Sequence, residues 1–441
     1  MLKWVKDGSK YLWPMKGGKV GLMNETDFYE STFRLWRISK TRFQFRRYDK
    51  KFLGLDNAKD GRFIVSVSQS PGRSETFKIF KQFPNSTRIR IKASNGLFLQ
   101  VNNEGLLTAD SRGDGGWKTD DPSVFEMIIL RKLDGEFQVT NGYGPLAPKV
   151  MKEHWDTFIT EDDFKFISSN GINTVRIPVG WWTARDPNPP APYVGGSLKT
   201  LDKAFSWAEK YGLKVIIDLH AAPGSQSEAT FSSSRDGFME WGETEQSIKD
   251  TVAVIDFLTA RYANHPSLYA VELLNEPQAP AISLDKLSDY YRAGYKAVRK
   301  HSSKAYVVLS NRMINGDEPA DPSQLLPLSQ DLEGSVIDLH HYHVFMPVFQ
   351  NMSLDQNIQF LRGNLSAQLD HLMSPSGASV FVGEWATEWA TGPSKEDYQK
   401  FAIAQLEVYD RASFGWAYWT LKSPPDHFSL EWMIKNGYIK L

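Results

Sequence analysis

The chain has 441 residues, of which 41% are hydrophobic and 23% charged, and its formal net charge is -1. Such a composition is typical of a globular protein with two or three domains. The balanced charge predicts no nucleic-acid partner, and the lack of a long apolar run predicts no membrane-spanning helix. Because the chain has no Cys, disulfides and thiolate metal sites are excluded.

Residues 1–131 have the pattern of short strands separated by turns, and aromatic elements recur within them. Phe33, Phe77 and Phe125 each begin a similar short segment, at spacings of 44 and 48 positions. A second element recurs between them, at 52–55 and 97–101. Repetition of a four-strand unit indicates a repeat architecture. Three such units predict a β-trefoil, since a propeller needs at least about four blades.

From about residue 154 onward, apolar strand-like runs alternate with helical stretches such as 198–211 and 398–409. This alternation predicts a parallel sheet. The expected strands are 174–179, 214–219, 268–274, 305–310, 335–339, 379–382 and 415–419. Polar residues at the strand ends, and the lack of a Gly-rich phosphate loop, favour a (β/α)8 (TIM) barrel over a nucleotide-binding fold.

The expected barrel shows seven strands rather than eight. Residues 136–140 could supply the eighth strand or belong to the trefoil. We therefore expect an all-β trefoil over 1–131, a linker over 132–153 and an α/β barrel domain over 154–441, with the first barrel strand not evident.

Two Glu residues follow buried strands: Glu276 in Leu-Asn-Glu-Pro (274–277) and Glu384 in Val-Gly-Glu-Trp (382–385). Side chains at the carboxyl ends of barrel strands converge on one site. Two carboxylates suffice to cleave a glycosidic bond, because one protonates the leaving oxygen and the other attacks or activates water. The alternatives are that Asn275-Glu276 caps a helix before Pro277 and that Glu384 forms a structural ion pair with Arg176.

Further polar or aromatic residues lie within or at the ends of the other expected strands, and we expect them to line the same site. They are Arg176, His220, Asn275, His340, Tyr342 and Trp419. His220 could instead be a core histidine. The sequence His340-His341-Tyr342-His343 has neither zinc-ligand spacing nor a matched acidic cluster. We therefore predict no metal and no cofactor.

Six segments resemble glycoside hydrolase family 5, in the branch of exo-β-1,3-glucanases and plant β-glucosidases. The segments, in the order of the family, are Val-Arg-Ile-Pro-Val-Gly-Trp-Trp (175–182), Asp-Leu-His-Ala-Ala-Pro-Gly-Ser-Gln (218–226), Leu-Asn-Glu-Pro (274–277), Asp-Leu-His-His-Tyr-His-Val-Phe (338–345), Val-Gly-Glu-Trp (382–385) and Gly-Trp-Ala-Tyr-Trp (415–419). The first half is similar to the fascin-like trefoil that plant members carry ahead of the second barrel strand.

This resemblance implies a role for each matching residue. Glu276 would be the general acid/base and Glu384 the nucleophile of a retaining β-glycosidase. Arg176 would bind the nucleophile and Asn275 the sugar 2-hydroxyl. The remaining site residues would be His220, His340 and Tyr342 around the terminal sugar, Trp419 below it, and Phe345 at the mouth of the site. The substrate would be a terminal β-D-glucosyl unit of a β-glucan or oligosaccharide, with β-1,3 linkages preferred, or a small-molecule glucoside.

Two departures from the family pattern accompany the resemblance. Ser227-Glu228-Ala229 stands where members usually have Asn-Gly and an aromatic residue, so the mouth of the site is expected to differ. Members begin with a Gly-Gly-Trp-Leu type of barrel strand, whereas Met1 lies within the first expected trefoil strand. A catalytically impaired sugar-binding or scaffold protein is therefore the alternative function. Actin binding would rest on fold analogy alone and is not expected. The family implies secretion, but the first residues do not resemble a signal peptide, so localisation stays open.

Overall fold

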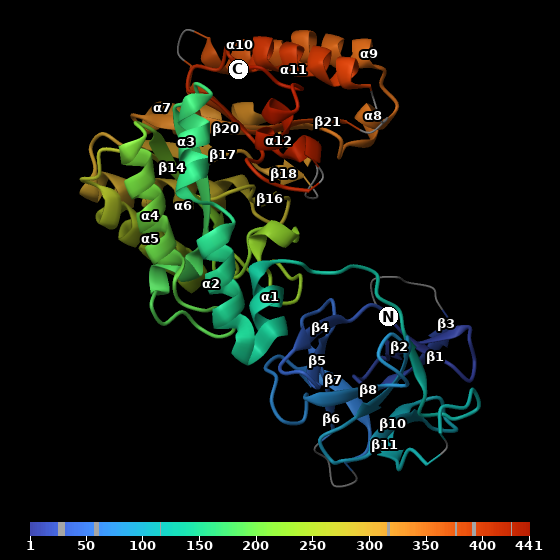
Figure 1. Cartoon of the computed structure of the whole chain (residues 1–441). Helices are drawn as coiled ribbons and strands as arrows, with labels where there is room; N and C mark the ends of the chain where they lie inside the picture. The colour runs from blue at the N-terminus through green and yellow to red at the C-terminus, as the bar shows by residue number, and fades with distance from the viewer. Residues whose placement is uncertain are drawn as a thin grey trace. The chain divides into compact units, whose positions relative to one another are not determined.

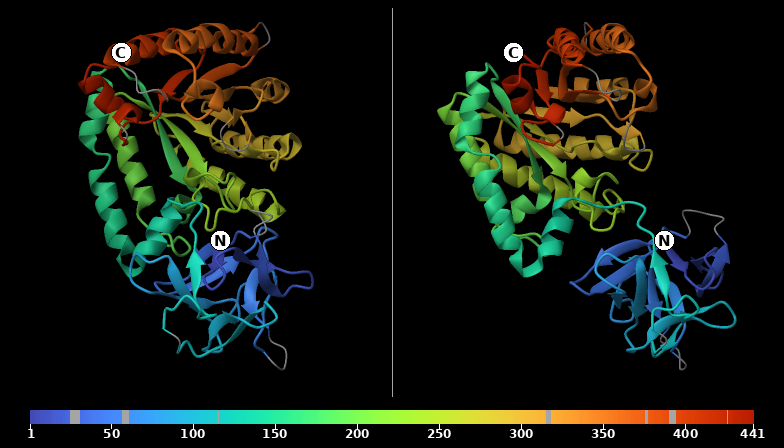
Figure 2. Two further views of the ribbon diagram at one scale, coloured as in Figure 1. Left: turned by 90° about the vertical axis from the view of Figure 1, so that its right-hand side faces the viewer. Right: turned by 45° about the vertical axis from the view of Figure 1, so that its right-hand side comes forward.

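The computed structural model describes residues 1–24, 31–56, 61–114, 116–314, 318–374, 377–389, 394–424 and 426–441. The chain forms two compact units, which are shown in Figures 1 and 2. The first unit contains Met1–Ala147 and Arg235–Gly237, and the second contains Pro148–Ser234 and Phe238–Leu441. Among the described helices, none combines the length and apolar character needed to cross a membrane.

The first unit contains a sheet of 12 short strands. They are β1 (Leu2–Trp4), β2 (Lys10–Pro14), β3 (Val20–Asn24), β4 (Arg34–Arg37), β5 (Arg42–Arg46), β6 (Phe52–Leu55), β7 (Ile64–Ser68), β8 (Phe77–Lys81), β9 (Arg88–Lys92), β10 (Phe98–Val101), β11 (Leu107–Ser111) and β12 (Phe125–Met127). Antiparallel pairing links β4 to β5, β5 to β8, β8 to β9, β9 to β12 and β12 to β1.

The other six strands of this sheet form three hairpins, β2–β3, β6–β7 and β10–β11. Bridges join these hairpins to one another through Gly21 and Leu106, and through Phe63 and Thr108. The six strands paired in sequence from β4 to β1, together with three hairpins, have the composition of the predicted β-trefoil. The recurring phenylalanines form its core: Phe77 and Phe125 are buried, and Phe33 packs against Phe45 with ring centroids 6.4 Å apart.

The second unit is built on a seven-stranded parallel sheet with the order β13-β14-β15-β17-β20-β21-β22. The strands are β13 (Thr174–Gly180), β14 (Lys214–Ala221), β15 (Leu268–Glu272), β17 (Tyr306–Ser310), β20 (Ser335–His343), β21 (Ser379–Trp389) and β22 (Gly415–Tyr418). All seven predicted barrel strands are thus present. A second small sheet contains β16 (Gln278–Ala279), β18 (Met313–Ile314) and β19 (Glu318–Pro319).

The described helices are α1 (Glu136–Tyr143), α2 (Ala147–Thr157), α3 (Glu161–Ser169), α4 (Ser197–Lys210), α5 (Glu245–Tyr262), α6 (Leu284–His301), α7 (Leu326–Asp331), α8 (Pro347–Gln350), α9 (Leu354–Phe360), α10 (Ser366–Met373), α11 (Lys395–Tyr409) and α12 (Leu430–Lys435). Helices α4 to α11 lie between the parallel strands, whose crossover connections need such elements, while α1 to α3 precede β13 and α12 follows β22. Helix α4 buries Leu201, Ala204, Phe205 and Ala208, whose spacing of three and four places them on one face.

The suggestion that residues 136–140 supply an eighth barrel strand is wrong, because they begin helix α1. Val139 and Thr140 have high β propensity, but Phe137 and Thr140 are buried together at helical spacing. The Thr140 hydroxyl also donates a hydrogen bond to the Glu136 carbonyl at 2.8 Å, which is a local contact of a helical turn. Tertiary burial therefore outweighs the strand propensity of this segment.

The parallel sheet is strongly curled. Arg176 on β13, the first strand in the order, lies 2.8 Å from Glu384 on β21, the sixth strand. His220 on β14 stacks on Trp419, which follows β22, with ring centroids 5.2 Å apart. In the part of the chain that the structure describes, β13 and β22 are not paired by backbone hydrogen bonds. The sheet is therefore a curled, open barrel whose strand ends face one another.

Candidate active site

Glu276 and Glu384 lie at the carboxyl ends of the curled sheet. Glu276 comes four residues after the end of β15, in a left-handed conformation with φ of 41° that is uncommon for residues other than glycine. Its backbone N–H donates to the Ser310 hydroxyl at 3.1 Å. Glu384 lies within β21. Both carboxyl side chains are largely buried, with 8% and 5% of their residue surfaces exposed.

The two carboxylates are close enough to act on one bond. One oxygen of Glu276, one oxygen of Glu384 and a ring nitrogen of His340 all lie within 4.8 Å of one another. Glycosidases that retain anomeric configuration separate their carboxyl groups by about 5–5.5 Å, and inverting enzymes by about 6.5–9.5 Å. The closest oxygens of Glu276 and Glu384, within 4.8 Å of each other, are compatible with the shorter of these two separations.

Arg176 connects side chains from several strands. Its Nε and Nη2 donate to both oxygens of Glu272 at 2.6 and 2.8 Å, and Nη1 donates to Glu384 Oε1 at 2.8 Å. Nη2 also donates to Asn275 Oδ1 at 2.7 Å, and Asp218 lies 3.2 Å away. Burial lowers the Arg176 pKa, but Asp218 and Glu272 outweigh burial and raise the pKa well above its usual value. The guanidinium therefore stays cationic.

Tyr342 holds the second oxygen of Glu384, because its hydroxyl donates to Oε2 at 2.7 Å. The two oxygens of Glu384 therefore each accept a hydrogen bond, one from Arg176 and one from Tyr342. Two donors on one carboxylate fix its plane and direction. Burial, followed by the charges of Glu384 and Glu276, raises the pKa of Tyr342 well above its usual value, so the phenol keeps its proton.

His340 bridges Glu276 and Asp338. Its Nδ1 lies 2.6 Å from Glu276 Oε1 and its Nε2 lies 3.1 Å from Asp338 Oδ2. Burial lowers the His340 pKa, but Glu384 and Asp338 outweigh burial and raise the pKa well above its usual value. An imidazolium donates from both nitrogens, which matches the two carboxyl oxygens that face it. Gly383 allows this arrangement, because a Cβ at that position would lie 2.1 Å from Asp338 Oδ1.

His220 and Trp419 form an aromatic wall of the site. Their rings are parallel within 2°, and His220 Nδ1 lies 2.5 Å from Asp218 Oδ2. The edge of Phe231 meets His220 with centroids 5.3 Å apart. Phe345 is different, because 49% of its surface is exposed and its ring contacts Tyr342 at 5.1 Å. The described rings thus supply both a buried wall and an exposed aromatic face.

The histidines of β20 divide between two faces of the strand. His340 and Tyr342 face the carboxylates, whereas His341 bonds Gln368 on α10 and His343 bonds Asn357 on α9. Alternation of side chains along a strand requires this division. Burial lowers the pKa of both His341 and His343 to about 4, so both are neutral near pH 7.

Asp218, Glu272 and Asp338 were not predicted from the sequence as site residues. All three acidic side chains are fully buried beneath Glu276 and Glu384. Burial raises the pKa of Glu272, and the charges of Asp218 and Asp338 add to this effect. Burial opposes ionisation of Asp218, but Arg176 and His220 outweigh it and lower the pKa. The sequence feature that could have identified these three residues is the presence of a charged residue within an otherwise apolar strand.

Among the described residues, two sets of side chains are close enough to hold a metal ion: Glu276, His340 and Glu384, or Glu272, Asp338 and His340. A metal-bound histidine must offer an unprotonated nitrogen. His340, in contrast, has a raised pKa and both of its nitrogens face carboxylates. The donor set therefore fits a proton-transfer site better than a metal site.

The fold and the site define a class: a barrel-type parallel sheet with two oriented carboxylates, as glycosidases use. Two family models match the sequence. A model described as a domain of unknown function (DUF7910) covers residues 2–130, and one described as cellulase (glycosyl hydrolase family 5) covers residues 140–424. The chain belongs to glycoside hydrolase family 5.

Three of the curated relatives, all fungal proteins, show what the chain resembles. A probable glucan 1,3-beta-glucosidase A of Aspergillus terreus is 36% identical over 62% of this chain and 64% of its own length. A glucan 1,3-beta-glucosidase of Pichia angusta is 36% identical over 57% of this chain and 62% of its own length. The chain thus spans less than two thirds of these two relatives. A probable glucan 1,3-beta-glucosidase A of Aspergillus fumigatus is 31% identical over 80% of this chain and 91% of its own length.

A solved structure supports the fold. The crystal structure of rutinosidase from Aspergillus niger has a TM-score of 0.60 and 22% identity, over 69% of this chain and 89% of that chain. At this level of identity the likeness concerns the fold alone.

Proposed function

We propose that this chain is a retaining β-glycosidase that removes terminal β-D-glucosyl units from β-glucans or oligosaccharides, with β-1,3 linkages preferred, or from small-molecule glucosides. The observation that carries this proposal is the pair Glu276 and Glu384, with donors fixed on each and with oxygens within 4.8 Å of each other and of His340. The names of the fungal relatives support the substrate class.

The reaction would proceed by double displacement. Glu384 attacks the anomeric carbon while Glu276 gives its proton to the departing oxygen, which forms a glycosyl-enzyme ester and frees the aglycone. Glu276, now a carboxylate, then takes a proton from water as the water attacks the same carbon and releases Glu384. Each step moves one proton, and the enzyme returns to its starting state.

The other residues would position the sugar and the nucleophile. Arg176 and Tyr342 hold Glu384 in one orientation. Asn275 Nδ2 has no hydrogen-bond partner among the described residues, so it is the donor that the sugar 2-hydroxyl would meet. Trp419 and His220 would contact the sugar, and Phe345 would contact the aglycone or the next sugar at the mouth. Such contacts contribute when they strengthen in the transition state.

We also propose that the chain is of the plant type and that its first unit is fascin-like. Both proposals rest on the three-unit trefoil pairing and on the order of domains along the chain. In this proposal the trefoil accompanies a catalytic domain and has no role in binding actin.

Turnover of an aryl β-glucoside by the purified full chain tests the proposal. We expect β-glucose as the first product by proton NMR, and loss of at least about 10³-fold in kcat for Glu384→Gln. Glu276→Gln should impair substrates with poor leaving groups much more than those with good ones. Glu245→Gln is the matched control, because that side chain is exposed on α5. First release of α-glucose, or binding without turnover, would contradict the proposal.

A further inference from the structure

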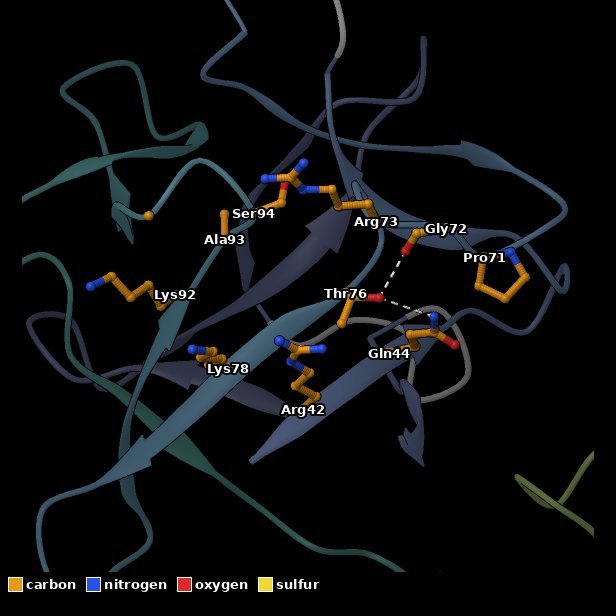
Figure 3. A pocket seen from close by; sticks show the side chains of 11 residues that line it. Arg42, Gln44, Pro71, Gly72, Arg73, Thr76, Lys78, Lys92, Ala93 and Ser94 are labelled. Carbon is orange, nitrogen blue, oxygen red and sulfur yellow. Dashed lines mark hydrogen bonds between the residues drawn. The ribbon is translucent and has the colours of Figure 1, made fainter. Parts of the chain in front are cut away.

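The first unit contains a cleft of about 670 Å³ that the glycosidase site does not use (Figure 3). Its walls come from strands β5, β8 and β9 and from the loops at 71–76 and 93–96. Clefts of about 300–1,000 Å³ are the usual size for small-ligand sites in proteins. The cleft is therefore large enough for an organic ligand rather than for a single ion.

Four cations line this cleft: Arg42, Arg73, Lys78 and Lys92. Of the described residues that line it, none is acidic. Within the described part of the chain, none of these four side chains forms an ion pair. The nearest acidic residue in the sequence, Glu75, accepts a hydrogen bond from a backbone N–H at 2.7 Å and is not part of the lining. The cleft thus carries positive charge that the protein itself does not neutralise.

Three of the cations form a row across the sheet. Arg42 on β5 is the direct cross-strand partner of Lys78 on β8, and Lys78 is the direct partner of Lys92 on β9. Like charges directly opposite each other destabilise a sheet. The whole chain is nearly neutral, with 51 basic and 52 acidic residues, so this row is not a by-product of a basic composition. An anionic ligand would remove the repulsion.

The spacing of the row indicates what the anion looks like. Neighbouring strands lie about 4.8 Å apart, so the three cations repeat at roughly that interval over about 10 Å. A ligand with carboxylates repeated along a chain can meet several of them at once, whereas a single phosphate cannot. Arg73, on the loop at 71–76, adds a planar guanidinium that suits a carboxylate.

The floor of the cleft is polar and uncharged. Gln44 Nε2 donates to Thr76 Oγ1 at 3.2 Å, and that hydroxyl donates to the Gly72 carbonyl at 2.8 Å. This order of donors leaves Gln44 Oε1, a buried acceptor without a partner among the described residues. Ser94 also lines the cleft. A hydroxylated ligand, or the water that it retains, satisfies such groups better than a purely ionic one.

The geometry points to a binding site for an acidic oligosaccharide, a glycan whose sugar units carry carboxylates, in the trefoil unit of this chain. The trefoil then binds a charged glycan while the other unit contains the glycosidase centre. This inference does not depend on the proposed glycosidase substrate, because the cleft and the carboxylate pair share no residue.

Calorimetric titration of the full chain with a short oligogalacturonate tests this inference. A neutral glucan oligosaccharide of equal length, inorganic phosphate and duplex DNA are the comparison ligands. We expect the oligogalacturonate to bind, the neutral glycan not to bind, and affinity to fall as salt rises. Lys78→Gln and Lys92→Gln should each weaken binding about tenfold. Lys16→Gln, an exposed cation outside the cleft, is the matched control and should bind normally.

Lys78→Gln has a second readout that separates lost binding from lost folding. Because it removes the central cation of the row, its melting temperature should equal or exceed that of the unchanged chain. Turnover of an aryl β-glucoside should be unchanged in the same variant. Equal affinity for the neutral glycan, tighter binding of DNA, binding of phosphate alone, or full affinity in Lys78→Gln would each overturn the inference.

Discussion

His343 should make the second unit sensitive to acid. The residue has 1% of its surface exposed, packs against Phe349 with ring centroids 4.3 Å apart, and places Nδ1 2.8 Å from Asn357 Oδ1. Burial lowers its pKa from 6.5 to about 4. Between these two values the unfolded chain binds a proton that the folded chain does not. Folding stability therefore rises with pH through this window and is lost as pH falls.

The size of this effect follows from the shift. Each unit of pKa difference corresponds to about 1.4 kcal/mol, so His343 alone should cost about 2 kcal/mol of unfolding free energy between about pH 8 and about pH 5. His343→Asn keeps a side-chain N–H near the position of Nδ1 and removes the titration. The variant loses packing at every pH, so the informative quantity is its pH dependence and not its absolute stability.

Urea unfolding of the full chain at several pH values, followed by tryptophan fluorescence, measures this dependence. His343→Asn should lose about 2 kcal/mol less than the unchanged chain over the window from about pH 8 to about pH 5. His371→Asn is the control, because that histidine is exposed on α10 and should leave the pH dependence unaltered. Identical pH dependence in the unchanged chain and His343→Asn would refute the reasoning.

Three further predictions concern the glycosidase site. Tyr342→Phe removes one hydrogen-bond donor from Glu384, so kcat/KM should fall about 10- to 100-fold while the melting temperature hardly changes. Tyr143→Phe, at an exposed position, is the control. Gly383→Ala forces a Cβ against Asp338, so thermal melting should show a loss of at least about 1 kcal/mol, whereas Gly363→Ala, with open space around its Cα, should not destabilise the chain. Activity should survive a chelator; loss of activity that added zinc restores would contradict the proton-transfer interpretation of His340.

Much of the fold could be predicted because local patterns determine it. The repeated phenylalanines indicated three trefoil units, and the apolar runs indicated all seven parallel strands. Residues 136–140 misled because their β propensity gave no information on the tertiary burial of Phe137. A local sequence pattern predicts whether a segment is a helix or a strand more reliably than it predicts which residues pack around that segment.

The candidate site residues could be named from the sequence, but their contacts could not. Glu276, Glu384 and Arg176 were chosen from their places in or after the expected strands, whereas Arg176 and Glu384 are 208 residues apart and meet only because the sheet curls. Glu272 and Asp338 were missed for the same reason, because they belong to the site only through their contacts with residues on other strands. The curvature of the sheet cannot be predicted from a single sequence.

The contact of Arg176 with β21 also has a consequence for the order in which the chain is completed. During synthesis β13, β14 and β15 emerge well before β21, so Arg176 first meets only Asp218, Glu272 and Asn275. The proposed mechanism needs Glu384, which is added 208 residues after Arg176. A nascent or truncated chain that ends before β21 can therefore contain most of the sheet yet have no hydrolytic capacity.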